Sequence, residues 1–113
     1  MKRIIHKDLA EGSWFKLSLI EQLANVGMDV ERTIQWKKRG EPEYSKHAFE
    51  RALELIDFIV ADPKNKGRLR EVLRVREALV DYFVYDNEYH STDEVWQKYF
   101  YYFNYASALS RGR

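Results

Sequence analysis

Residues 91–110 read STDEVWQKYFYYFNYASALS, and this stretch decides the fold class. It opens with an S-x-x-E capping box, and its two acidic residues place negative charge at the positive end of a helix dipole. Seven of the eleven residues in Val95–Tyr105 are aromatic. We predict a helix over 92–110 whose rings point in nearly every direction. A helix that is apolar all round should be covered all round. The rings therefore also predict that a second subunit or a ligand covers the side of this helix that the bundle leaves bare.

Three segments upstream of this helix also have apolar residues at steps of three and four, which predicts amphipathic helices. The first begins at Ser13 as N-cap and ends before Gly40, and the second ends before Asp62-Pro63. We predict these helices over 13–39, 43–61 and 67–85. Short connections make consecutive helices antiparallel. The sequence therefore predicts an all-α, up-down-up-down four-helix bundle over 13–113, a single domain, after an N-terminal arm over 1–12.

The composition limits the function classes. A chain of 113 residues has the size of one domain, and a net charge of +1 gives it no global field toward nucleic acid or membrane. Absence of cysteine excludes a disulfide framework and a thiolate nucleophile. The glycines fit no phosphate-binding loop, and the Glu-x-x-His motif of di-iron bundles does not occur, so we predict no cofactor and no metal. Without an apolar export or membrane segment, we expect a soluble protein of the cytoplasm.

The aromatic residues of 92–110 exceed what one bundle core needs. Bare rings would form a large exposed apolar patch, and two-fold pairing is the commonest way to cover one. We therefore predict a homodimer. The predicted interface residues are Trp96, Tyr101, Tyr102 and Tyr105. The alternatives are a bound ligand, a nucleic acid stacked on the rings, or tyrosine edges that simply face water.

A basic cluster lies where the third helix begins. Its predicted anion-binding residues are Lys64, Lys66, Arg68, Arg70 and Arg74. Cations at a helix N-terminus oppose the helix dipole, so they do not serve helix stability, whereas they suit phosphate or RNA backbone. The alternative is that acidic residues of neighbouring helices neutralise them.

Two residues interrupt the apolar seams. Arg76 falls on the seam of the third helix, so we predict a mostly buried ion pair with Glu31 or Asp57. Gly27 falls mid-helix on the first seam, where glycine costs roughly 1 kcal/mol relative to alanine. A close helix crossing under a large ring, such as Trp96 or Phe100, would explain that glycine, and a ligand cleft is the alternative.

These observations leave two hypotheses for function. The first is a non-enzymatic, self-associating protein-interaction module. The second is an RNA- or phosphate-binding bundle that uses the basic cluster, with His90 as an acid–base candidate. In size and helical architecture the chain resembles the HEPN domains, whose mark is an arginine followed a few residues later by a histidine. Arg39 and His47 are the nearest such pair, at a wider spacing. That resemblance implies a ribonuclease or a toxin–antitoxin component.

Overall fold

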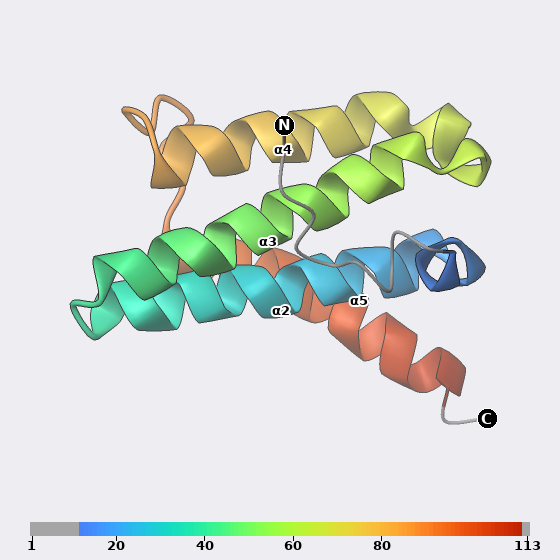
Figure 1. Ribbon diagram of the computed structural model, residues 1–113, viewed down its shortest axis with the longest axis horizontal. Helices are drawn as coiled ribbons and strands as arrows, with labels where there is room; N and C mark the ends of the chain where they lie inside the picture. The colour runs from blue at the N-terminus through green and yellow to red at the C-terminus, as the bar shows by residue number, and fades with distance from the viewer. Residues whose placement is uncertain (1–11, 112–113) are drawn as a thin grey trace.

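The computed structural model describes residues 12–111, and these residues form four α-helices. The α-helices are α2 (Leu19–Lys38), α3 (Pro42–Ala61), α4 (Leu69–Phe83) and α5 (Asp93–Arg111). Two 3-10 helices, η1 (Ser13–Lys16) and η2 (Pro63–Arg68), precede α2 and α4. Consecutive α-helices run in opposite directions, and no strand occurs among the described residues (Figure 1). The predicted all-α, up-down-up-down bundle is confirmed. The predicted arm lies outside the described residues except for Gly12.

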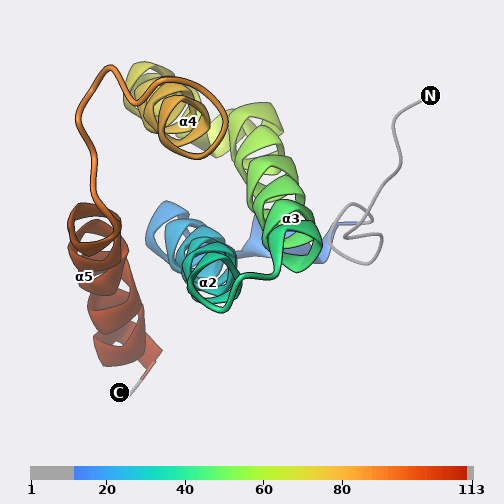
Figure 2. The same cartoon turned by 90° about the vertical axis from the view of Figure 1, so that its left-hand side faces the viewer.

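Helix α2 lies at the centre of the bundle, between α3 and α5 (Figure 2). Helix α2 packs extensively against both α3 and α5. Helix α4 lies over α3, and the contact between α3 and α4 is smaller than either contact of α2. The largest fully buried apolar side chains come from η1, α2, α3 and α4: Trp14, Val26, Val30, Ile34, Ile56, Ile59 and Leu79. Helix α5 therefore occupies an edge of the bundle, where α2 is its main neighbour.

The first long helix begins later than predicted. Ser18 is the N-cap of α2, because its hydroxyl accepts from the Glu21 N–H at 3.1 Å and the Glu21 carboxylate accepts from the Ser18 N–H at 3.0 Å. This reciprocal capping box satisfies two N–H groups that the first turn leaves without partners, so the helix begins after Ser18 rather than after Ser13. The segment before it, η1, places Trp14 in the core with no exposed surface.

The last helix begins at Asp93, one residue later than predicted. The Thr92 hydroxyl accepts from the Val95 N–H at 3.1 Å, which makes Thr92 the capping residue. Ser91 instead belongs to the preceding loop, where its N–H donates to Asn87 Oδ1 at 2.8 Å. Asn87 has a φ of 54°, a left-handed conformation that asparagine tolerates better than most residues. Helix α4 ends at Phe83, with Val84 as its C-cap, rather than at residue 85.

Helices α2 and α5 cross at Gly27. A Cβ added there would lie 2.7 Å from Phe100 Cβ and 3.0 Å from Phe100 Cγ. Only glycine leaves room for the base of the Phe100 side chain to rest on the backbone of α2. The predicted close crossing under a ring is confirmed, and it determines which side of α5 faces the core.

Candidate interaction surface on helix α5

The rings of α5 divide between an inner and an outer side. Trp96 and Phe100 are buried against α2 and belong to the hydrophobic core. On the outer side, Tyr101, Tyr102 and Tyr105 keep 63%, 65% and 51% of their surface exposed. The side of α5 opposite the core is therefore aromatic, whereas an ordinary amphipathic helix has a polar side there.

Trp96 was wrongly predicted as an interface residue. Its side chain is only 6% exposed, because it packs into the core of the single chain, so it adds little to the outer surface of α5. Among the described residues, neither its indole N–H nor that of Trp14 has a hydrogen-bond partner. The sequence could not distinguish Trp96 from the outer rings, because both sets follow helical spacing.

Five outer residues of α5 recur at steps of three and four, and we name them the outer strip. They are Val95, Lys98, Tyr102, Tyr105 and Leu109. All five are exposed, and the four apolar members are each more than half exposed. Tyr101 lies beside the strip, with its ring stacked on that of Tyr105 at 6.4 Å between centroids. The prediction of interface residues missed Val95 and Leu109, although their spacing was visible in the sequence.

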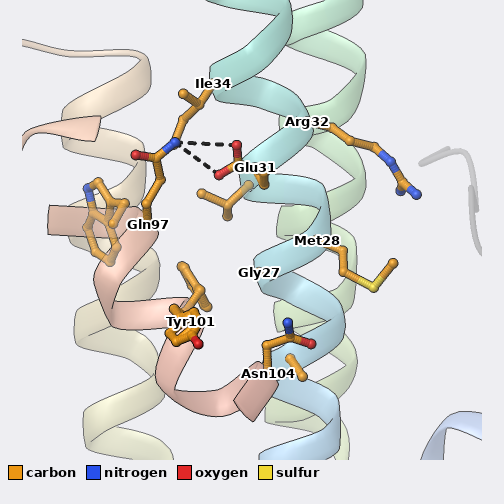
Figure 3. A pocket seen from close by; sticks show the side chains of 12 residues that line it. Gly27, Met28, Glu31, Arg32, Ile34, Gln97, Tyr101 and Asn104 are labelled. Carbon is orange, nitrogen blue, oxygen red and sulfur yellow. Dashed lines mark hydrogen bonds between the residues drawn. The ribbon is translucent and has the colours of Figure 1, made fainter. Parts of the chain in front are cut away.

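A groove of about 490 Å³ runs between α2 and α5 beside the outer strip (Figure 3). Gln97 bridges the two helices at one end, because its Nε2 donates to the Glu31 carboxylate at 3.1 and 3.3 Å. Tyr101 and Asn104 line the other end from α5. Met28 lines the groove from α2, and its side chain is more than half exposed. The groove therefore extends the exposed aromatic surface of α5 onto α2.

Arg76 pairs with one of its two predicted partners but is not buried. Its Nε donates to Asp57 Oδ1 at 3.0 Å, and the two side chains are 34% and 37% exposed. The apolar side of α4 centres on Val72 and Leu79, which leaves Arg76 at its margin. The prediction of a mostly buried ion pair is therefore wrong about burial. Of the two alternative partners, Asp57 is confirmed, and Glu31 accepts from Gln97 and from Gln35 instead.

Two of the five predicted anion-binding residues are held by neighbouring carboxylates. Arg68 Nη2 and Nε donate to Glu71 Oε2 at 2.6 and 3.0 Å on the surface. Lys64 Nζ donates to the buried Asp62 carboxylate and, at 3.4 Å, to the Phe15 carbonyl. The other three, Lys66, Arg70 and Arg74, are exposed. The cluster is thus divided: Lys64 pairs with a buried carboxylate, Arg68 pairs with an exposed one, and the other three are surface cations.

Asp62 is the centre of the polar network that holds Lys64. Gln22 Nε2 donates to its Oδ2 at 2.9 Å, and the Lys64 N–H donates to its Oδ1 at 3.1 Å. Asn65 Nδ2 extends the network by donating to Gln22 Oε1 at 2.9 Å. Burial by itself raises the pKa of the Asp62 carboxyl, but hydrogen bonds from Lys64 and Gln22 outweigh burial and hold that pKa below its usual value. The network fastens η1, α2 and η2 together, which is a structural role for Lys64.

The described residues offer no second kind of site with clearer chemistry. Within 12–111, no group of three or more His, Cys, Asp or Glu side chains could hold a metal ion. In the same part of the chain, no helix has the length and apolar character to cross a membrane. Searches of protein-family models, curated proteins and solved structures returned no match to this chain. The α5 surface is therefore the best-defined candidate, and its geometry is what a function must be argued from.

Proposed function

We propose that this protein is a non-enzymatic interaction module that forms a homodimer through the outer side of α5. The observation that carries the proposal is the exposure of Tyr101, Tyr102 and Tyr105 on one helix, beside Val95 and Leu109. Exposed apolar patches of this kind mark interaction sites in most proteins that keep them. Tyrosine suits such a surface, because its ring provides apolar area while its hydroxyl stays compatible with water.

The energetics of the rings favour a weak to moderate dimer. Hiding roughly 100 Å² of one ring contributes roughly 2.5 kcal/mol at about 25 cal/mol per Å². Six rings in a symmetric pair would contribute roughly 15 kcal/mol before costs. Association itself costs about 4–15 kcal/mol. The difference is a net gain between zero and about 11 kcal/mol, and the roughly 8 kcal/mol of a micromolar dimer lies within that span.

The test is sedimentation of the wild type and of the double variant Tyr101→Glu, Tyr105→Glu across micromolar concentrations. We expect a wild-type dimer and a variant monomer that keeps its helical circular dichroism, because glutamates would place like charges on both copies. The matched control is Tyr44→Glu, Tyr85→Glu, which charges two equally exposed tyrosines outside α5. A monomeric wild type at high micromolar concentration would refute the proposal.

The alternative is RNA or phosphate binding, including a HEPN-like ribonuclease. It is supported by Arg70 and Arg74, which are exposed one helical turn apart on α4, with Lys66 nearby in the chain. Arg39, the arginine of the HEPN-like pair, lies over the Trp36 ring at 5.3 Å. Retention on an RNA column that falls steeply with salt, and that Arg70→Gln, Arg74→Gln abolishes, would favour this alternative over the dimer.

A further inference from the structure

We propose that the outer strip of α5 packs against the outer strip of a second copy in antiparallel orientation, about a two-fold axis near Tyr102. This inference rests on the proposed self-association and adds the orientation and register of the two helices. The residues that carry it are the five of the outer strip. Their spacing, their charge and the length of the strip each argue for this one arrangement.

The spacing of the outer strip is that of a helix–helix seam. From Val95 to Leu109 the steps are three, four, three and four, as in the seam of two interlocking helices. The inner side of α5 carries its own set, which includes Trp96, Phe100 and Phe103 and packs into the core. Helix α5 thus has two opposed seams, and a single copy fills only the inner one.

The charges of α5 select the orientation. Lys98 is an exposed member of the strip, and Glu94 is exposed one turn before it. A parallel two-fold pair would set Lys98 against Lys98 and Glu94 near Glu94, and like charges in such a seam oppose pairing. An antiparallel pair centred on Tyr102 moves the two Lys98 side chains apart, and likewise the two Glu94 side chains. It also brings Lys98 toward Tyr105 of the partner subunit, whose ring face attracts a cation. The antiparallel arrangement also opposes the two helix dipoles favourably.

The length of the strip is sufficient for a small interface of the weak class. At about 1.5 Å per residue, the strip from Val95 to Leu109 is roughly 21 Å long. Two helices in contact over that length, with Tyr101 adding to one margin, would bury on the order of 1,000 Å² in total. That area reaches the lower limit for a specific interface. Val95 and Leu109 each lie seven residues from Tyr102, so the antiparallel pair brings Val95 of one copy near the partner's Leu109.

Single cysteines test the orientation directly, because the chain contains none of its own. A disulfide forms only when the two Cα atoms lie within about 7 Å. We expect Val95→Cys and Leu109→Cys to stay unlinked when each is oxidised alone. An equimolar mixture of the two should form a disulfide heterodimer at least tenfold faster, seen on a non-reducing gel. Tyr85→Cys, exposed but outside α5, measures linking by random collision.

The outcomes separate this inference from the proposed function. Self-linking of Val95→Cys and of Leu109→Cys above the Tyr85→Cys control would overturn it in favour of a parallel pair. A wild-type dimer in which no strip cysteine links faster than that control would overturn it while leaving self-association intact. A wild-type monomer would remove the proposed function together with this inference.

Discussion

Gly27 is where a single hydrogen atom in place of a methyl group decides how two helices meet. A methyl group there would overlap Phe100 Cβ, which belongs to the stem of the ring and cannot swing aside. Neither α2 nor α5 can yield locally, since both are regular helices at this point. The cost of adding a methyl group can be measured at Gly27 and compared with the cost at Gly67, where an added Cβ contacts no other atom.

We expect Gly27→Ala to destabilise the protein although alanine is the better helix former. Overpacking costs about 1–3 kcal/mol, and the helix preference for alanine returns about 1 kcal/mol. The expected net loss is therefore up to about 2 kcal/mol in the free energy of unfolding, measured by urea denaturation. Gly67→Ala is the matched control, because a Cβ there meets nothing within 4 Å. Equal stabilities of the two variants would contradict the close crossing.

Asp62 should make stability depend on acidity. Its pKa is held below the usual value in the folded protein, so the carboxylate stabilises the fold above the ordinary pKa of about 3.9. That contribution is lost as pH falls through the lower folded pKa. We expect Asp62→Asn to cost about 1–3 kcal/mol at pH 7, because buried donors lose a charged acceptor.

The pH dependence provides the check on Asp62. The Tm values of the wild type and of Asp62→Asn should converge as the pH falls below the pKa that Asp62 has in the folded protein. Asp86→Asn, which replaces an exposed carboxylate, is the control and should follow the wild type. A gap between Asp62→Asn and the wild type that stays constant from pH 7 to pH 2 would contradict a charged, hydrogen-bonded Asp62.

At the scale of the element, helix α4 is attached to α3 by apolar packing and by one cross-helix ion pair between Arg76 and Asp57. Because a third of each side chain is exposed, water screens the pair and solvates either partner when the other is removed. We expect Arg76→Ala to cost about 1 kcal/mol or less in the free energy of unfolding. A loss of 3 kcal/mol or more would mean that the pair is effectively buried, as the sequence alone suggested.

The position of α4 also explains why its seam was misjudged. Helical spacing allows Leu73 and Arg76 to share the apolar side with Val72 and Leu79. In the bundle, α4 is rotated so that Val72 and Leu79 are buried while Leu73 remains 47% exposed. Spacing alone determines the width of an apolar stripe poorly, and the packing of α3 selects which part of it is covered.

At the scale of the whole molecule, a dimer held by α5 makes stability depend on protein concentration. Dimer formation stabilises the folded chain by mass action, so the Tm of the wild type should rise by several degrees over a hundredfold increase in concentration. The Tm of Tyr101→Glu, Tyr105→Glu should not change, because its charged faces repel. A wild-type Tm independent of concentration would contradict assembly through α5.

The sequence by itself determined that this protein is a bundle of four antiparallel helices, because apolar spacing, caps and short connections are local properties. Even so, we predicted the first N-cap at Ser13, whereas α2 begins at the capping box of Ser18 and Glu21, with Trp14 buried ahead of it. The tertiary structure also decided which side of α5 faces the core and which side is exposed. Its inner and outer seams have equally regular spacing, and the outer one is left exposed because Gly27 accepts Phe100 on the inner side. Contacts between distant residues determine this choice, and spacing along one helix cannot encode it.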